Sequence, residues 1–98
     1  MNQFQCIATI AERDVVRYTP AGIPIVAVKL LHSSQQVEAG IQRLVEFEIS
    51  ATAAGEISAK LSQAELGISF RFTGFMARKN RNSRSLVFHI TDFENNIY

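Results

Sequence analysis

The stretch that decides the fold is residues 17–24, which reads Arg17-Tyr18-Thr19-Pro20-Ala21-Gly22-Ile23-Pro24. It separates two strand-like runs, Phe4 to Ile10 and Ile25 to Leu31. Pro20 fixes its own φ at about −65°, and Gly22 can adopt a positive φ. The sequence therefore predicts a turn over residues 19–22.

The residues on either side of this turn carry further information. Pro24 has no N–H to donate, so we expect it at the start of a strand or on a sheet edge. Arg17 and Tyr18 precede the turn, where a cation suits a phosphate and an aromatic ring suits a base. A hairpin loop with an incidental Arg and Tyr is the alternative, and the local chemistry alone does not exclude it.

Length and composition narrow the class of protein. The 98 residues predict one domain, residues 1–98, whose modest core makes a homo-oligomer unsurprising. No apolar run is long enough for a transmembrane helix, and the N-terminus lacks the pattern of a secretory signal. The single cysteine, Cys6, allows no intrachain disulfide. We therefore expect a reduced, cytoplasmic compartment and no membrane association.

Alternation of apolar and polar residues predicts the remaining elements. Five runs have the pattern of strands: residues 4–10, 23–32, 42–50, 68–77 and 86–93. Residues 33–40 are polar and are expected to form a loop, and residues 55–63 have the composition of a short helix. Gly74 within the fourth run predicts a bulge or a tight bend. This order is that of an OB-fold, an all-β, five-stranded Greek-key barrel with one short helix.

Positive charge gathers in the loop between the last two predicted strands. The net charge is only +1, but residues 66–91 contain no Asp or Glu. Within this window the loop holds four cations, Arg78, Lys79, Arg81 and Arg84. OB-folds bind nucleic acid at the loop between the first two strands and at the loop between the last two. A solvated hairpin tip is the alternative, but the absence of a nearby acid favours contact with a polyanion.

Single-stranded nucleic acid also requires aromatic rings on which bases can stack. The candidates are Tyr18, Phe47, Phe75 and Phe88, although Phe47, like Phe70 and Phe72, fits the barrel core better. Phe75 alternates with Arg71 and Thr73, so we expect it to face solvent. The resulting candidate DNA-binding residues are Arg17, Tyr18, Arg43, Arg71, Phe75, Arg78, Lys79, Arg81 and Arg84.

The side chains that could take part in catalysis do not form the pattern of an active site. His32 and His89 are interpreted as structural histidines, and Cys6 as a small core residue. Glu46 and Glu48 could pair on one strand face, but without a third polar partner they fit a solvated edge better. The sequence contains no nucleotide-binding, metalloprotease or hydrolase motif, so we expect no enzyme, no metal and no cofactor.

Residues 17–24 resemble the corresponding segment of two related bacterial groups, the single-stranded DNA-binding proteins and the primosomal replication protein N (PriB) family. Two further stretches resemble the second group: Leu31-His32-Ser33 with residues 37–40, and Gly74-Phe75 with the basic loop and residues 87–89. Single-stranded DNA-binding proteins carry a long disordered extension after the barrel. A chain that stops at Tyr98 is therefore expected to belong with the primosomal group.

The resemblance implies a homodimeric restart factor that binds single-stranded DNA, stimulates the PriA helicase and helps to assemble the other primosome proteins. By position, Arg17, Arg43 and the loop cations match the DNA-contacting basic residues of the family. Glu46 stands where some members carry a DNA-contacting Trp, and Ile41 and Ser33 replace an aromatic residue and a cation. These departures imply weaker DNA binding that relies more on residues 78–84. An assembly adaptor with weak DNA binding and a tailless general single-stranded DNA-binding protein remain as alternatives.

Overall fold

Six strands and one helix make up the computed structural model, which describes residues 1–96. Their bounds are β1 (Phe4–Arg13), β2 (Arg17–Tyr18), β3 (Pro24–Glu38), β4 (Ile41–Ala54), α1 (Glu56–Gln63), β5 (Ser69–Arg78) and β6 (Leu86–Asn95). Ile97 and Tyr98, the end of the predicted 1–98 domain, lie outside the described residues. The extent of that domain therefore stays a prediction.

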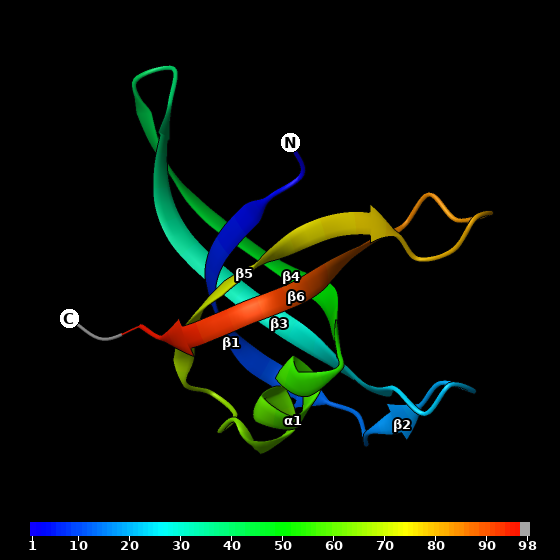
Figure 1. Ribbon diagram of the computed structural model, residues 1–98. Coiled ribbons are helices and arrows are strands. Elements are labelled where there is room, and N and C mark those ends of the chain that lie inside the picture. Colours follow the sequence, from blue (N-terminus) through cyan, green and yellow to red (C-terminus); the bar gives the residue numbers. More distant parts are fainter. Residues whose placement is uncertain (97–98) are drawn as a thin grey trace.

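Five of the strands close into a barrel (Figure 1). β1 pairs antiparallel with β5 through residues 4–9 and with β3 through residues 9–13. β3 continues the sheet to β4, β4 runs parallel to β6, and β6 returns antiparallel to β5. The parallel contact between the third and fifth barrel strands is the Greek-key crossing of an OB-fold. The predicted fold class is confirmed.

Alternate residues of the strands fill the barrel. Val26, Val28 and Leu30 of β3 are buried, as are Phe70 and Phe72 of β5. The burial of Phe70 and Phe72 confirms their predicted place in the barrel core, whereas β3, predicted to be apolar on both faces, buries alternate residues.

Helix α1 covers one end of the barrel and packs the fully buried Leu61 against the core (Figure 1). Arg13 of β1 donates hydrogen bonds from Nη1 to the carbonyl oxygens of Leu61 and Ala64, so a cation caps the C-terminus of the helix. Among residues 1–96, no helix has the length and apolar character needed to cross a membrane.

The prediction of a loop over residues 33–40 is wrong. β3 continues to Glu38, and β4 begins at Ile41, so residues 33–46 form a two-stranded arm that leaves the barrel (Figure 1). Ala39 and Gly40 join its strands with φ values of 53° and 74°, which suit a two-residue hairpin turn. The arm is polar because most of its side chains on both faces are exposed to solvent, not because it lacks regular structure.

The other predicted elements differ from the structure mainly at their ends. The first strand reaches Arg13 after a bulge between Ile10 and Glu12, and the third strand continues to Ala54. The helix is confirmed to within one residue at its start. The short strand β2 was not predicted, because two residues are too few to show an alternation.

The turn and the strand start predicted around residues 17–24 are confirmed. The N–H of Gly22 donates to the carbonyl oxygen of Thr19 at 2.8 Å, and Gly22 has a φ of 83°. The N–H of Ile23 donates to Oγ1 of Thr19, so the Thr19 side chain also links the two ends of the turn. Pro24 is the first residue of β3.

The bulge predicted at Gly74 is also confirmed, since the register of β5 against β6 shifts between Thr73 and Gly74. A Cβ atom on Gly74 would lie 1.9 Å from the carbonyl oxygen of His89, a backbone atom that cannot move aside. Only glycine therefore lets β5 and β6 approach each other this closely.

We expect Gly74→Ala to lower the free energy of unfolding by about 2 kcal/mol or more, because the two strands must separate to admit the methyl group. Gly40→Ala is the matched control: a methyl group at Gly40 meets no atom within 4 Å, so only its positive φ should cost about 1 kcal/mol. Urea unfolding at one protein concentration compares the two variants. A Gly74→Ala variant as stable as Gly40→Ala would contradict this explanation of the bulge.

Candidate nucleic-acid interface

The segment of residues 17–24 forms a small hairpin beside the barrel. Arg17 of β2 pairs with Ile25 of β3, and Tyr18 pairs with Pro24. The turn at residues 19–22 holds this hairpin, so Arg17 and Tyr18 are presented from a defined backbone. Both side chains are exposed, with 69% of Tyr18 accessible to solvent.

The basic loop, residues 78–85, is held by its own polar side chains. Lys79 N–H donates to the carbonyl oxygen of Ser85 at 2.9 Å, and Asn80 Oδ1 accepts the N–H of Asn82 at 3.0 Å. Oγ of Ser83 accepts the N–H of Ser85. Such side-chain turns bend the backbone locally. Its four cations, Arg78, Lys79, Arg81 and Arg84, are all exposed.

The two loops meet at one concavity on the outer face of the barrel, which we call the outer groove. Arg17 from the first loop and Lys79 from the basic loop both line it, and its volume is about 370 Å³. Figure 1 shows both loops extending from the same side of the barrel, away from the arm. The structure thus brings together two cations that lie 62 positions apart in the sequence (79 − 17).

The floor of the outer groove is formed by outward-facing residues of β3, β4 and β6. Lys29 lies on β3 and donates a hydrogen bond from Nζ to Oγ of Ser50 at 2.9 Å. Thr52 and His89 continue the lining across β4 and β6, where they are partners in the parallel ladder. Glu12 and Asp14 also line the groove, so its three cations face two carboxylates.

An aromatic stack lies beside this groove. Phe75 of β5 pairs with His89 of β6, and their rings stack with centroids 4.8 Å apart and planes 4° apart. Phe75 is 39% exposed, which confirms that it faces solvent.

Two of the cations that were predicted to bind DNA lie away from this groove and form ion pairs with acidic residues. Arg43 lies on the arm and forms an ion pair with Glu38, whereas Arg71 of β5 pairs with Glu94 at 3.2 Å. Neither lines the outer groove. The stretch without acids, residues 66–91, ends before Asp92 and Glu94, so a count of charges along the chain could not show this pairing.

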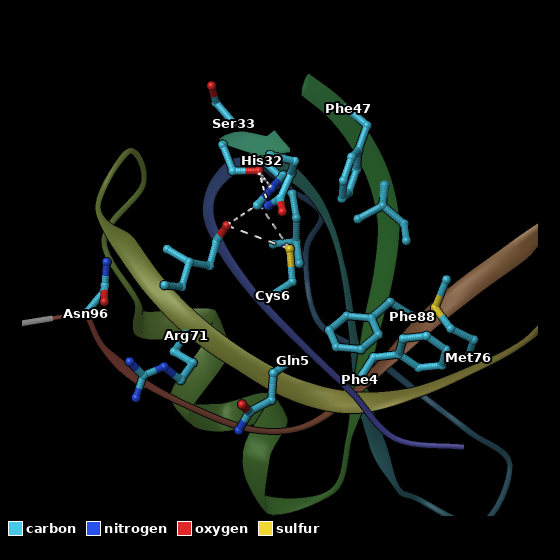
Figure 2. A pocket seen from close by; sticks show the side chains of 15 residues that line it. Phe4, Gln5, Cys6, His32, Ser33, Phe47, Arg71, Met76, Phe88 and Asn96 are labelled. Carbon is cyan, nitrogen blue, oxygen red and sulfur yellow. Dashed lines mark hydrogen bonds between the residues drawn. The ribbon is translucent and has the colours of Figure 1, made fainter. Parts of the chain in front are cut away.

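A second, larger concavity lies between β1 and the base of the arm, and we call it the edge groove (Figure 2). Its volume is about 810 Å³, and β1 and the base of the arm supply much of its lining. His32 lies there between Cys6 and Phe47: Nδ1 donates to the carbonyl oxygen of Ile7 at 2.6 Å, Nε2 accepts from Oγ of Ser34 at 2.7 Å, and the ring stacks on Phe47. His32 is therefore a satisfied structural histidine, as predicted.

Cys6 is half-buried beside this histidine, with Sγ 3.3 Å from Nδ1 of His32. Burial raises the pKa of the Cys6 thiol above its ordinary value, because a thiolate is poorly solvated there. The thiol packs against the core, as the sequence predicted.

Two interpretations of aromatic residues are wrong. Phe47 was expected in the core but is 43% exposed, because position 47 lies where β4 leaves the barrel. Phe88 was a stacking candidate but is 3% exposed, since it points into the barrel. Lys29 and His89 were missed as lining residues. The only signal for Lys29 was a single cation in an otherwise apolar strand.

Comparison with known proteins identifies the family. Residues 2–92 match the model of a family described as another single-strand binding protein family. The replication restart protein PriB of Nitrosomonas europaea is 46% identical over 91 residues, which cover 93% of this chain and 84% of that protein. The chain belongs to the PriB family. The PriB of Bordetella pertussis is 37% identical over 90 residues, covering 92% of this chain and 84% of that protein.

Solved structures agree with this assignment. A PriB structure from Ralstonia solanacearum superposes with a TM-score of 0.91 and 43% identity, covering 99% of both chains. A small single-stranded DNA-binding protein from Streptomyces coelicolor matches with a TM-score of 0.71 over 97% of this chain and 92% of that one. Its identity is only 12%, so that match shows a shared fold and nothing more. The PriB family thus shares its barrel with single-stranded DNA-binding proteins.

Proposed function

We propose that this chain is a single-stranded DNA-binding accessory protein of the replication-restart primosome. The observation that carries the proposal is the outer groove, where Arg17 and Lys79 from the two loops converge beside the stacked rings of Phe75 and His89. Cations hold phosphates and ring faces hold bases, which is the combination that single strands require. The restart proteins among its PriB relatives support the same role.

Within this function the loop cations and Arg17 supply most of the affinity, and Tyr18 and Phe75 add aromatic contacts. For the described residues, no ion pair involves Arg17, Arg78, Lys79, Arg81 or Arg84, whereas Arg43 and Arg71 each have one. An exposed ion pair is weak, so a phosphate can still compete for Arg43 and Arg71. We assign these two a secondary role in binding, and we assign the chain no catalysis.

The protein acts by stimulating the PriA helicase and by helping the other primosome proteins to assemble. A single strand held in the outer groove gives the helicase a protein-bound substrate at the restart site. The alternative, an adaptor with weak DNA binding, is favoured by one observation: Glu46 and Glu48 are exposed on the outer face of β4, opposite Ser33 and Leu31. Their charge would repel a strand that runs along the arm.

We further propose that the chain forms a homodimer through β1. Residues 4–8 pair with β5 on one side, but within residues 1–96 no strand pairs with their other edge, since pairing with β3 begins at Thr9. An open edge next to an apolar groove is suited to antiparallel pairing with a second copy. Phe4, which is 51% exposed, would be covered in such a dimer.

Replacing Arg78, Lys79, Arg81 and Arg84 together with Ala is expected to weaken binding of oligothymidine at low salt. The slope of log affinity against log salt should flatten by about 0.7 for each phosphate that the protein no longer neutralises. Fluorescence anisotropy over a salt series measures both quantities. The control is the double variant Arg43→Ala, Arg71→Ala, whose cations are already paired. A slope that changes as much in the control as in the loop variant would contradict the loop assignment.

Glu46→Lys is expected to raise the affinity for oligothymidine several-fold at low salt, because a phosphate-repelling charge becomes attractive. If DNA binding limits the function, stimulation of PriA unwinding should rise in parallel. Glu65→Lys, an exposed charge reversal after α1, is the control for net charge. Tighter DNA binding without greater stimulation would instead support the adaptor.

Sedimentation equilibrium tests the proposed dimer. The native chain should sediment as a dimer, and Phe4→Glu should shift it to monomer, because the new carboxylate would be buried at the interface. Val15→Glu, at an 87% exposed loop position, should leave the dimer intact. A monomeric native chain would refute the dimer, and a tetramer would favour the general single-stranded DNA-binding protein.

A further inference from the structure

The two histidines of the chain have opposite environments. Both ring nitrogens of His32 are engaged, one with Ile7 and one with Ser34. In the part of the chain that the structure describes, no hydrogen bond reaches the ring of His89. His89 is only partly buried, so its ring nitrogens and part of its surface are available to a ligand.

The position of His89 between Phe75 and the outer groove gives its two ring faces different neighbours. Phe75 lies flat against one face, with the planes 4° apart. Thr52 of β4 is the ladder partner of His89 on the other side, and both residues line the outer groove, whereas Phe75 does not line it. Since Thr52 and His89 both line the outer groove, a ligand held in that groove approaches the imidazole from the side away from Phe75.

The backbone maintains this arrangement. The bulge at Gly74 immediately precedes Phe75, and bulges redirect the side chains next to them. The close approach of Gly74 to the carbonyl oxygen of His89 brings the two strands together at the position of the stack. The glycine is therefore required at the one point where Phe75 must meet His89.

We propose that His89 is the residue that stacks on a nucleobase of single-stranded DNA, and that Phe75 is a positioning residue that supports the imidazole from behind. The base inserts into the outer groove against the second face of His89, so that Phe75, His89 and the base form a continuous stack. Lys79, Lys29 and Arg17 line the same groove, where they neutralise the phosphates on either side of that base. This inference rests on the proposed function, and it moves the aromatic contact with DNA from Phe75 to His89, a residue that the sequence indicated to be structural.

The stack and the cations make separable contributions to affinity. Contacts between cations and phosphates weaken steeply with salt, whereas stacking of a base on a ring depends little on it. Loss of the His89 ring should thus lower the affinity by a similar factor at every salt concentration. Loss of Lys79 should instead flatten the salt dependence.

Proton NMR of the native protein tests the proposal directly, because only two histidines contribute imidazole signals. On saturation with oligothymidine, the ring current of the stacked base should move the His89 signals upfield and leave those of His32 in place. An abasic oligonucleotide of the same length supplies the phosphates without bases and should not produce the shift. An equal shift with the abasic strand would overturn the stacking.

Variants provide a second measurement by fluorescence anisotropy. His89→Leu should weaken oligothymidine binding about tenfold with an unchanged salt slope, as expected for the loss of one stacked base, and His89→Phe should restore most of the affinity. Phe47→Ala, which removes the ring stacked on His32 in the edge groove, is the matched control and should bind like the native chain.

The outcomes separate this inference from the function on which it rests. Native affinity in His89→Leu, or unmoved His89 signals in a protein that binds oligothymidine, would overturn the stacking role and leave DNA binding intact. Failure of the native protein to bind oligothymidine at low salt would overturn both.

Discussion

One strand, β1, closes the barrel, and the other features of the molecule depend on that closure. Its residues 4–9 hold β5 and its residues 9–13 hold β3, so without β1 the ends of the sheet would not meet. Closure removes most of the unpaired strand edges, which could otherwise pair with other chains and cause aggregation. It also positions the hairpin of residues 17–24 and the basic loop on the same side of the barrel, where both line the outer groove.

The point at which β1 and β3 separate determines the rest of the surface. Thr9 pairs with Leu31, and after that position β3 continues with β4 alone as the arm. His32 donates to the carbonyl oxygen of Ile7 at this junction and so replaces the ladder that has ended. This separation leaves two grooves of different character, the outer groove and the edge groove. The cationic outer groove suits a polyanion, and the edge groove with its open strand edge suits a second copy of the chain.

Much of the fold could be predicted because the barrel has one buried and one exposed face, which imposes a period of two on each strand. The order of five strands and a helix, the turn at Gly22 and the bulge at Gly74 each have a local cause in the sequence. The arm could not be recognised, because a two-stranded ribbon with both faces mainly exposed has the composition of a loop. Phe47 was misplaced for the same reason.

The candidate site could be predicted only in part. Arg17 and the loop cations were found because loop position and charge are local properties. Lys29 and His89 were missed, since whether they line a groove depends on the register between strands that are distant in sequence. The register between β5 and β6 pairs Arg71 with Glu94, which a count of charges along the chain cannot show. No pattern within one strand distinguishes His89 from the structural His32.

The proposed function requires single-stranded DNA to lie across the outer groove between the two loops. A crystal structure of the protein with a short oligothymidine shows directly whether it does. We expect phosphates against Arg17 and Lys79, with the strand crossing β6, β4 and β3 on the outer face. DNA bound instead along the edge groove, against Cys6, His32 and Phe47, would refute this placement.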